Sequence, residues 1–116
     1  MRYALLIYAD ESSWGDASEE DRRVGYQRYS EYGRWLGDQG WIRGGDQLAS
    51  SASATCVRVE DGRTVTTDGP YAETTEQLGG FYLIETDDLD QAIEAASWLP
   101  AVERGTIEVR PIVEDG

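Results

Sequence analysis

Large apolar side chains occupy consecutive positions in two short segments of the chain, residues 2–8 and residues 81–84. The first segment reads Arg-Tyr-Ala-Leu-Leu-Ile-Tyr and the second reads Phe-Tyr-Leu-Ile. Because an extended backbone sends neighbouring side chains to opposite sides of a sheet, both segments would be apolar on two faces. The pattern therefore predicts two central strands in a sheet that must be covered on both sides.

A helix is predicted from Ser18 to about Gly37. Ser18, followed by Asp21 three residues later, resembles a capping box, in which side chains satisfy the free backbone N–H groups at a helix start. Apolar residues at helical spacing follow: Tyr29, Tyr32 and Leu36. We expect these aromatic residues to pack on the sheet, because helical spacing explains them without a cofactor site.

A second helix is predicted after Asp87 and Asp88, two acids that suit the positive end of a helix. Its expected buried stripe contains Leu89, Ala92, Ile93, Ala96 and Leu99. Pro100 is expected to stop this helix, since proline lacks the N–H group that a helix interior needs.

Shorter elements are predicted between the two helices. Residues 10–16 form an expected polar loop that carries Trp14. A strand that begins at Trp41 meets Gly44-Gly45, which predicts a bulge or a close backbone approach. The β-branched runs at residues 54–59 and 64–67 flank Asp61-Gly62, a typical hairpin turn.

Residues 106–113 alternate as a last strand, so the predicted order is strand, helix, strand, hairpin, loop, strand, helix, strand. This order fits an α+β, ferredoxin-like βαβ-βαβ sandwich with an extra β-hairpin. Right-handed crossovers would place both helices on one face of the sheet, and no segment remains to cover the other face. We therefore predict a homodimer whose two sheets pack together.

The turn at residues 68–71, Asp-Gly-Pro-Tyr, resembles the Asp-Gly-Pro-Phe motif of the DGPF group within the YCII-related family, with Tyr71 in place of phenylalanine. The similarity runs from the opening strand through residues 72–74 and 76–80 to residues 109–111. It implies a single YCII-related domain over residues 1–116 and a small ferredoxin-like homodimer, often called a dimeric α+β barrel. It implies no settled activity, and some family members are encoded beside alternative sigma factors.

Composition narrows the classes of function. The 116 residues include ten arginines, no lysine and no histidine, and the net charge is −13. Such a charge repels a phosphate backbone, so we expect no nucleic-acid partner. No apolar run approaches the roughly 20 residues of a membrane span and the N-terminus lacks a signal pattern, so we expect a cytoplasmic protein with no membrane partner.

The absence of histidine limits the chemistry that the chain can perform, because imidazole is the side chain best poised for proton transfer near neutral pH. Distant relatives in the wider family carry a His and Asp pair that this chain lacks. Triads and Cys-His pairs are excluded, and the single thiol, Cys56, is expected to be a small strand residue. We expect no metal and no cofactor.

Asp68 is the candidate acid, because the turn at Gly69-Pro70 presents it at a strand end. It would serve as a catalytic acid or base, or as a ligand anchor. The alternative is a turn residue whose carboxylate accepts a nearby backbone N–H group. Glu73 lies close enough along the loop to add a second carboxylate, unless it is only a solvated or capping residue.

Four aromatic residues complete the predicted site. Tyr8 and Tyr82 would donate hydrogen bonds to a ligand. Trp14 and Tyr71 would form its apolar walls, unless they only plug the edge of the core.

Two functions from different classes follow. In the first, a homodimer binds a small organic molecule in a cleft bounded by the loops at Asp10 and Asp68, with acid/base chemistry as an extension that depends on Asp68. In the second, the chain is a non-catalytic regulatory or protein-interaction module linked to an alternative sigma factor. The missing histidine favours the second function slightly.

Overall fold

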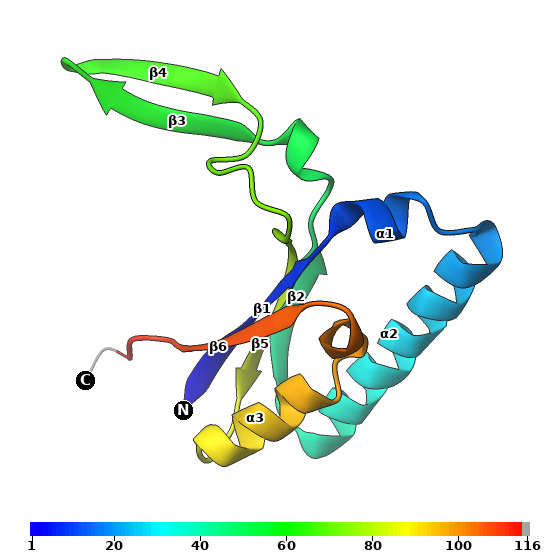
Figure 1. Ribbon diagram of the computed structural model, residues 1–116. Helices are drawn as coiled ribbons and strands as arrows, with labels where there is room; N and C mark the ends of the chain where they lie inside the picture. The colour runs from blue at the N-terminus through cyan, green and yellow to red at the C-terminus, as the bar shows by residue number, and fades with distance from the viewer. Residues whose placement is uncertain (115–116) are drawn as a thin grey trace.

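A four-stranded antiparallel sheet forms the centre of the molecule, with its strands in the order β2-β5-β1-β6 (Figure 1). The computed structural model describes residues 1–114, so the last two residues of the predicted domain, 115 and 116, lie outside the described residues. The strands are β1 (Arg2–Ala9), β2 (Ile42–Gln47), β5 (Gln77–Glu85) and β6 (Thr106–Pro111). β1 pairs antiparallel with both β5 and β6. This arrangement confirms the predicted α+β, ferredoxin-like fold.

Two helices, α2 (Glu19–Gln39) and α3 (Leu89–Ser97), cover one face of this sheet (Figure 1). The buried core between helices and sheet consists of Tyr3, Leu5, Ile7, Tyr32, Leu36, Ile84, Ala92, Ala95, Ala96 and Leu99. Tyr29 is partly buried against it. The predicted apolar stripe of the first helix is therefore confirmed as core.

The two ends of α2 follow the local sequence signals. The Ser18 hydroxyl oxygen accepts a hydrogen bond from the Asp21 backbone N–H over 3.0 Å, as the predicted cap requires. At the other end Gly40 has φ +76°, a left-handed conformation that glycine adopts without a Cβ clash. The helix therefore extends two residues beyond the predicted end at Gly37.

The prediction of a loop at residues 10–16 was wrong, because a short helix, α1 (Glu11–Gly15), forms there. Asp10 caps it, since its carboxylate accepts from the Ser12 backbone N–H. The Trp14 side chain packs edge-on against Tyr26 of α2, with 5.2 Å between ring centroids. A packing contact to another helix thus stabilises a helix too short to persist by itself.

The predicted buried stripe of α3 was partly wrong. Leu89 is 48% exposed and Ile93 is 50% exposed, whereas Ala95, which the pattern omitted, is fully buried. Alanines let the helix approach its neighbours closely, and the larger side chains then lie at the edges of the contact. The helix ends at Ser97, and Pro100 begins the short 3-10 helix η2 (Pro100–Glu103) instead of stopping α3.

Strand β2 contains the predicted bulge, since its pairing with β5 shifts register between Ile42 and Gly44. Gly45 has φ +147°, and a Cβ atom placed there would lie 2.5 Å from the Phe81 carbonyl oxygen. The predicted close backbone approach is therefore confirmed at Gly45.

Strands β3 (Thr55–Glu60) and β4 (Arg63–Asp68) form a separate hairpin that extends away from the main sheet (Figure 1). Its turn residues Asp61 and Gly62 have φ values of 51° and 75°, as a type I′ turn requires. A single-turn 3-10 helix, η1 (Ser51–Ser53), leads into the hairpin. The predicted hairpin and its turn are confirmed.

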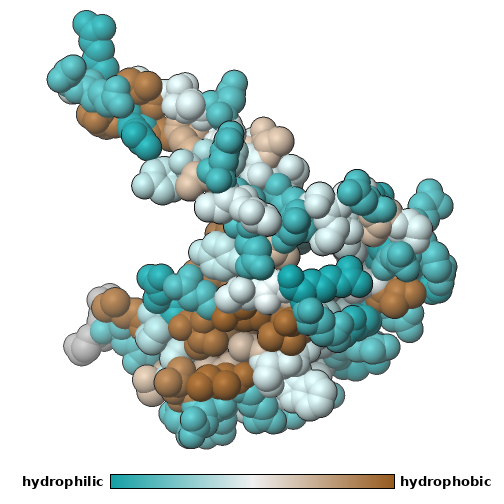
Figure 2. Space-filling view, in the orientation of Figure 1, coloured by the Kyte–Doolittle hydropathy of each residue, from teal (hydrophilic) through white to brown (hydrophobic). Residues whose placement is uncertain are grey.

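The sheet face opposite α2 and α3 is also apolar. Ala4 pairs with Leu83 and Leu6 pairs with Phe81, and all four side chains alternate with those of the core. Figure 2 shows hydrophobic residues gathered across the middle of the molecule and again on the hairpin. Within residues 1–114 no helix covers this face.

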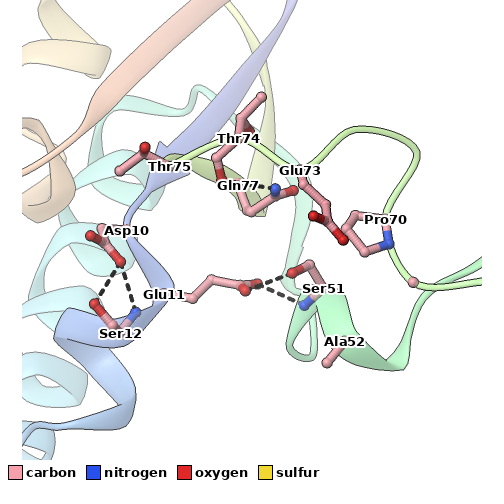
Figure 3. Close-up of a pocket in the computed structure, with 11 residues that line it drawn as sticks. Asp10, Glu11, Ser12, Ser51, Ala52, Pro70, Glu73, Thr74, Thr75 and Gln77 are labelled. Atoms are coloured by element: carbon pink, nitrogen blue, oxygen red, sulfur yellow. Dashed lines mark hydrogen bonds between the residues drawn. The ribbon is translucent and has the colours of Figure 1, made fainter.

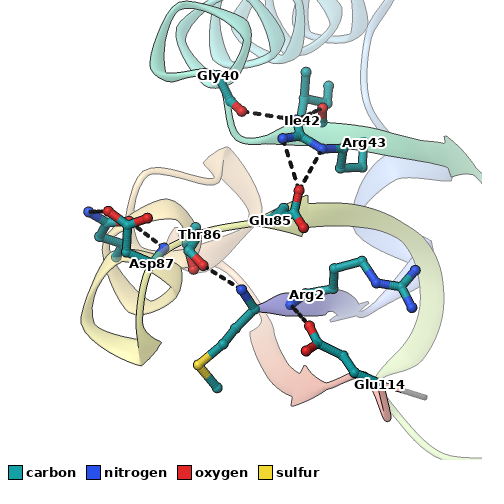
Figure 4. Close-up of polar contacts among 10 residues, drawn as sticks. Arg2, Gly40, Ile42, Arg43, Glu85, Thr86, Asp87 and Glu114 are labelled. Atoms are coloured by element: carbon teal, nitrogen blue, oxygen red, sulfur yellow. Dashed lines mark hydrogen bonds and ion pairs between the residues drawn. The ribbon is translucent and has the colours of Figure 1, made fainter. Parts of the chain in front are cut away.

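Polar contacts close the end of the sheet where the N-terminus lies (Figure 4). The Met1 amino group donates to the Thr86 carbonyl oxygen over 2.8 Å. The Arg43 guanidinium group pairs with the Glu85 carboxylate at 3.1 Å and so joins β2 to β5. Among the described residues, no helix combines the length and apolar character needed to cross a membrane.

Candidate functional site

A groove of about 510 Å³ opens between the start of α1 and the loop that joins β4 to β5 (Figure 3). It is lined by residues 10–12, 51–52, 69–70, 73–75 and 77. The groove therefore occupies the position predicted for a cleft, between the segments that follow Asp10 and Asp68. Three stretches far apart in the sequence meet at this place.

Asp10 and Ser12 form one wall of the groove. The Asp10 carboxylate accepts a hydrogen bond of 2.7 Å from the Ser12 hydroxyl and one of 3.0 Å from the Ser12 backbone N–H. These bonds stabilise the ionised carboxylate and lower the pKa of Asp10. Asp10 is therefore a fixed negative charge at the edge of the groove.

Glu11 joins two walls of the groove. One of its carboxylate oxygens accepts from the Ser51 backbone N–H and the other from the Ser51 hydroxyl, each over 2.7 Å. Figure 3 shows this pair of hydrogen bonds spanning from α1 to η1. The contact fixes the relative position of elements that are 40 residues apart, and it uses both oxygens of Glu11.

The loop after β4 forms the opposite wall and is held mainly by backbone acceptors. The Gly69 N–H donates to the Ala54 carbonyl oxygen over 2.7 Å. The Gln77 side-chain amide donates to the carbonyl oxygens of Ala72 and Thr74, at 2.9 and 3.1 Å. Gly69 has φ +98°, so the predicted need for glycine at this turn is confirmed.

Comparison with known proteins agrees with this fold. The sequence profile of the YCII-related domain matches residues 1–114. The chain belongs to the YCII-related family. An uncharacterised protein of Rhizobium meliloti (strain 1021) is 39% identical over 117 residues, an alignment that covers 97% of this chain and 92% of that protein.

In this YCII-related protein the two candidate acids lie at different places. Glu73 lines the groove, and no other lining residue shown in Figure 3 hydrogen-bonds its carboxylate. Asp68 is exposed at the end of β4, paired across the hairpin with Thr55, and the groove lining begins one residue later at Gly69. Pro70, two residues after Asp68, has no N–H group that could donate a hydrogen bond to the Asp68 carboxylate.

The aromatic residues predicted for the site lie on other surfaces. Trp14 faces α2, where its ring lies 2.9 Å from the position of a Cβ on Gly25. Tyr71 is 81% exposed, with the Arg58 guanidinium group 5.7 Å from the centre of its ring. The structure therefore assembles a groove from carboxylates and hydroxyl groups, whereas the aromatic side chains are distributed around it.

The two tyrosines predicted as donors point to opposite faces of the sheet. Tyr82 packs edge-on against Tyr32 on the helix side, 5.3 Å between ring centroids, and burial raises the pKa of Tyr82 to about 12. Tyr8 alternates with Ile7 and lies on the uncovered face, at the point where Gly79 forms a bulge in β5. They cannot contact one ligand within a single chain.

Sequence reasoning missed most of the polar lining of the groove. Ser12, Glu11 and Ser51 carry no local pattern that distinguishes them from other polar surface residues. Thr74 and Thr75 follow the Asp-Gly-Pro-Tyr turn closely in the sequence. Their position in this loop is the sequence feature from which they could have been predicted to line the groove. Only the fold brings these groups to one groove.

Proposed function

We propose that this YCII-related protein binds a small organic molecule in the groove between α1 and the loop after β4. The observation that carries the proposal is the Glu73 carboxylate, which faces a groove rimmed by the hydroxyl groups of Ser12, Thr74 and Thr75. Groups of this kind orient a ligand through a small number of placed hydrogen bonds. Glu73 would be the anchor and the hydroxyl groups would select the shape of the ligand.

The charge of the lining favours a ligand that is cationic or rich in hydrogen-bond donors. Asp10, Glu11 and Glu73 all contribute carboxylates, and no arginine of residues 1–114 lines the groove. An anionic ligand would be repelled by these charges and by a net charge of −13. Small amines and amino-alcohols match this chemistry better than carboxylic acids do.

Proton transfer is a further step of the proposal and depends on Asp68. A catalytic carboxylate needs burial or a close neighbouring charge to work near neutral pH, and Asp68 is exposed in one chain. The step therefore requires that an assembled protein encloses Asp68. Binding by itself requires only the groove.

The homodimer is also part of the proposal. Ala4, Leu6, Phe81 and Leu83 present an apolar sheet face that no helix of the described chain covers. Burying such a face contributes roughly 25 cal/mol per Å² before the costs of association. A second copy supplies a matching face by symmetry.

Thermal-shift measurements test the binding proposal. Small amines and amino-alcohols should raise the melting temperature in a concentration-dependent manner, whereas carboxylic acids of similar size should not. Glu73→Gln should abolish the shift. Glu76→Gln removes the same charge from the same loop but from a residue outside the lining, and should keep the shift. Equal shifts for the two variants, or stabilisation by acids alone, would contradict the proposal.

The alternative proposal is a regulatory or protein-interaction module without catalysis, linked to an alternative sigma factor as in the gene neighbourhoods of the family. The chain has no histidine, and both candidate acids are exposed, which favours binding to a partner over chemistry. This alternative would be favoured over the first proposal if the protein formed a stoichiometric complex with a different protein and no small molecule raised its melting temperature.

A further inference from the structure

The β3–β4 hairpin divides its side chains sharply between its two faces. Cross-strand partners share a face, and Val57 pairs with Thr66 while Val59 pairs with Thr64. These four residues, which we name the uncharged arm face, are all β-branched. The same face carries Asp68 at the root of the hairpin, because Asp68 pairs with Thr55. The four positions between this root and the turn of the hairpin carry no charge.

The opposite face of the hairpin carries charged side chains, which are readily solvated. It carries Arg58, Glu60 and Arg63, and the Arg58 guanidinium group lies over the ring of Tyr71. Cys56, Val65 and Thr67 lie on this face as well, between the charged side chains. On the uncharged arm face, by contrast, the charged residue is Asp68 at the root of the hairpin.

This face is open in the single chain. Val57 is 62% exposed and Val59 is 71% exposed. The radius of gyration is 16.2 Å, against about 13 Å for a compact chain of this length, because the hairpin projects from the body. A two-stranded hairpin with no apolar support is marginally stable in water, so a surface that covers it would stabilise it.

The direction of the hairpin indicates what covers it. Figure 1 shows that it projects on the side of the sheet away from α2 and α3, the side on which Leu6 and Phe81 lie. The hairpin and the uncovered sheet face therefore lie on the same side of the molecule. A stable interface buries about 800 Å² on each partner, and the arm enlarges the contact beyond the small sheet face.

We infer that the uncharged arm face packs against a second copy of this chain, a contact that rests on the homodimer proposed above. Two chains of net charge −13 repel each other, and a contact through the four uncharged residues of the arm lets them meet at a lower electrostatic cost. The contact turns Asp68, which shares this face, toward the partner copy. The acid of the motif thereby lies at the boundary between two subunits instead of in open water.

Two valines on opposite faces of the hairpin provide a matched test. Val59→Asp places a charge on the uncharged arm face, and Val65→Asp places the same charge on the charged face of the same hairpin. Sedimentation equilibrium should show that Val59→Asp raises the dimer dissociation constant by about tenfold or more, and that Val65→Asp changes it by less than about threefold. Equal dissociation constants for both variants and the parent would overturn the inference.

A photocrosslinker identifies the contact directly. With p-benzoylphenylalanine at position 59, irradiation of the purified protein should join two copies, with the attachment mapped by mass spectrometry to the arm or the uncovered sheet face of the partner. The same group at position 65 should give little product. Cross-links confined to one chain would overturn the arm contact. A parent chain that is monomeric at micromolar concentration would overturn the homodimer as well, whereas a parent dimer insensitive to Val59→Asp would overturn the arm contact alone.

Discussion

The Tyr32 hydroxyl group of α2 donates a hydrogen bond of 2.7 Å to the backbone carbonyl oxygen of Ala95 in α3. Ala95 lies in the last turn of its helix, where carbonyl groups lack an intrahelical donor. Both residues are buried, so water cannot replace the bond without opening the core. The Tyr32 side chain thus joins the two helices and donates a hydrogen bond to a carbonyl group at the end of α3.

Removing this hydroxyl group should destabilise the fold. Tyr32→Phe leaves the Ala95 carbonyl oxygen buried without its donor, and we expect the free energy of unfolding to fall by about 1–2 kcal/mol. Urea denaturation measures the change. Tyr26→Phe on the same helix is the control, because the Tyr26 side chain is exposed, and it should change stability by less than about 0.5 kcal/mol. Equal effects would contradict the structural role of the bond.

Stability should fall at alkaline pH because of Tyr32, which is buried, and Tyr82, which is partly buried. Burial raises the pKa of Tyr82 to about 12, and it also raises the pKa of Tyr32, from an ordinary value of 10.0. Between pH 10 and pH 12 the unfolded chain therefore loses phenolic protons that the folded chain keeps. The stabilisation is complete below pH 10 and is lost as the pH rises toward 12.

Tyr82→Phe tests this linkage. The variant should show a shallower fall of unfolding free energy with pH over this range, by up to about 1.4 kcal/mol per pH unit for one proton. Tyr71→Phe removes a phenol that is exposed in the folded chain and should leave the slope unchanged. Parallel pH profiles for the parent and Tyr82→Phe would refute the expectation.

A side chain at Gly45 of β2 should destabilise the fold. A Cβ atom there would meet the Phe81 carbonyl oxygen at 2.5 Å, and φ is +147°. Gly45→Ala should lower the unfolding free energy by about 2 kcal/mol or more, or prevent folding. Gly33→Ala, in the middle of α2 with no atom near its Cβ position, should instead stabilise by about 0.5–1 kcal/mol. Thermal and urea unfolding distinguish these opposite signs.

The groove wall should loosen when Glu11 loses one acceptor. Glu11→Gln keeps the shape of the side chain but offers one oxygen to two donors on Ser51. We expect the amide hydrogen of Ser51 to exchange at least about fivefold faster, since its opening free energy falls by about 1 kcal/mol. Glu31→Gln, an exposed change within α2, should leave that amide unaffected. Unchanged exchange at Ser51 in Glu11→Gln would count against the bridge.

Local patterns were sufficient for elements that depend on two to four adjacent residues. The hairpin turn at Asp61-Gly62, the cap at Ser18 and the close backbone approach at Gly45 each follow from backbone preferences of those residues themselves. The short helix α1 escaped prediction for the opposite reason. Its stability depends on Trp14 packing against α2, a contact that no local signal encodes.

The groove was predictable only in outline. The motif loop and the segment after Asp10 were both recognised as its borders, and Glu73 was among the candidates. The bond between Glu11 and Ser51 spans 40 residues, so its partners look like ordinary polar surface in the sequence. Tyr82 and Tyr8 were grouped because both follow apolar strands, but strand alternation sends them to opposite faces.

The sequence by itself determined the order of the elements, the ferredoxin-like topology and the presence of an apolar sheet face that the helices leave uncovered. Those properties arise from side-chain periodicity and backbone preference, which act over a few residues. Only the tertiary structure decided which acid faces the groove, and that Asp68 lies on the same face of a projecting hairpin as Val57 and Val59. Such relationships depend on strand register and on contacts between distant segments, where a shift of one residue would turn every side chain to the other face.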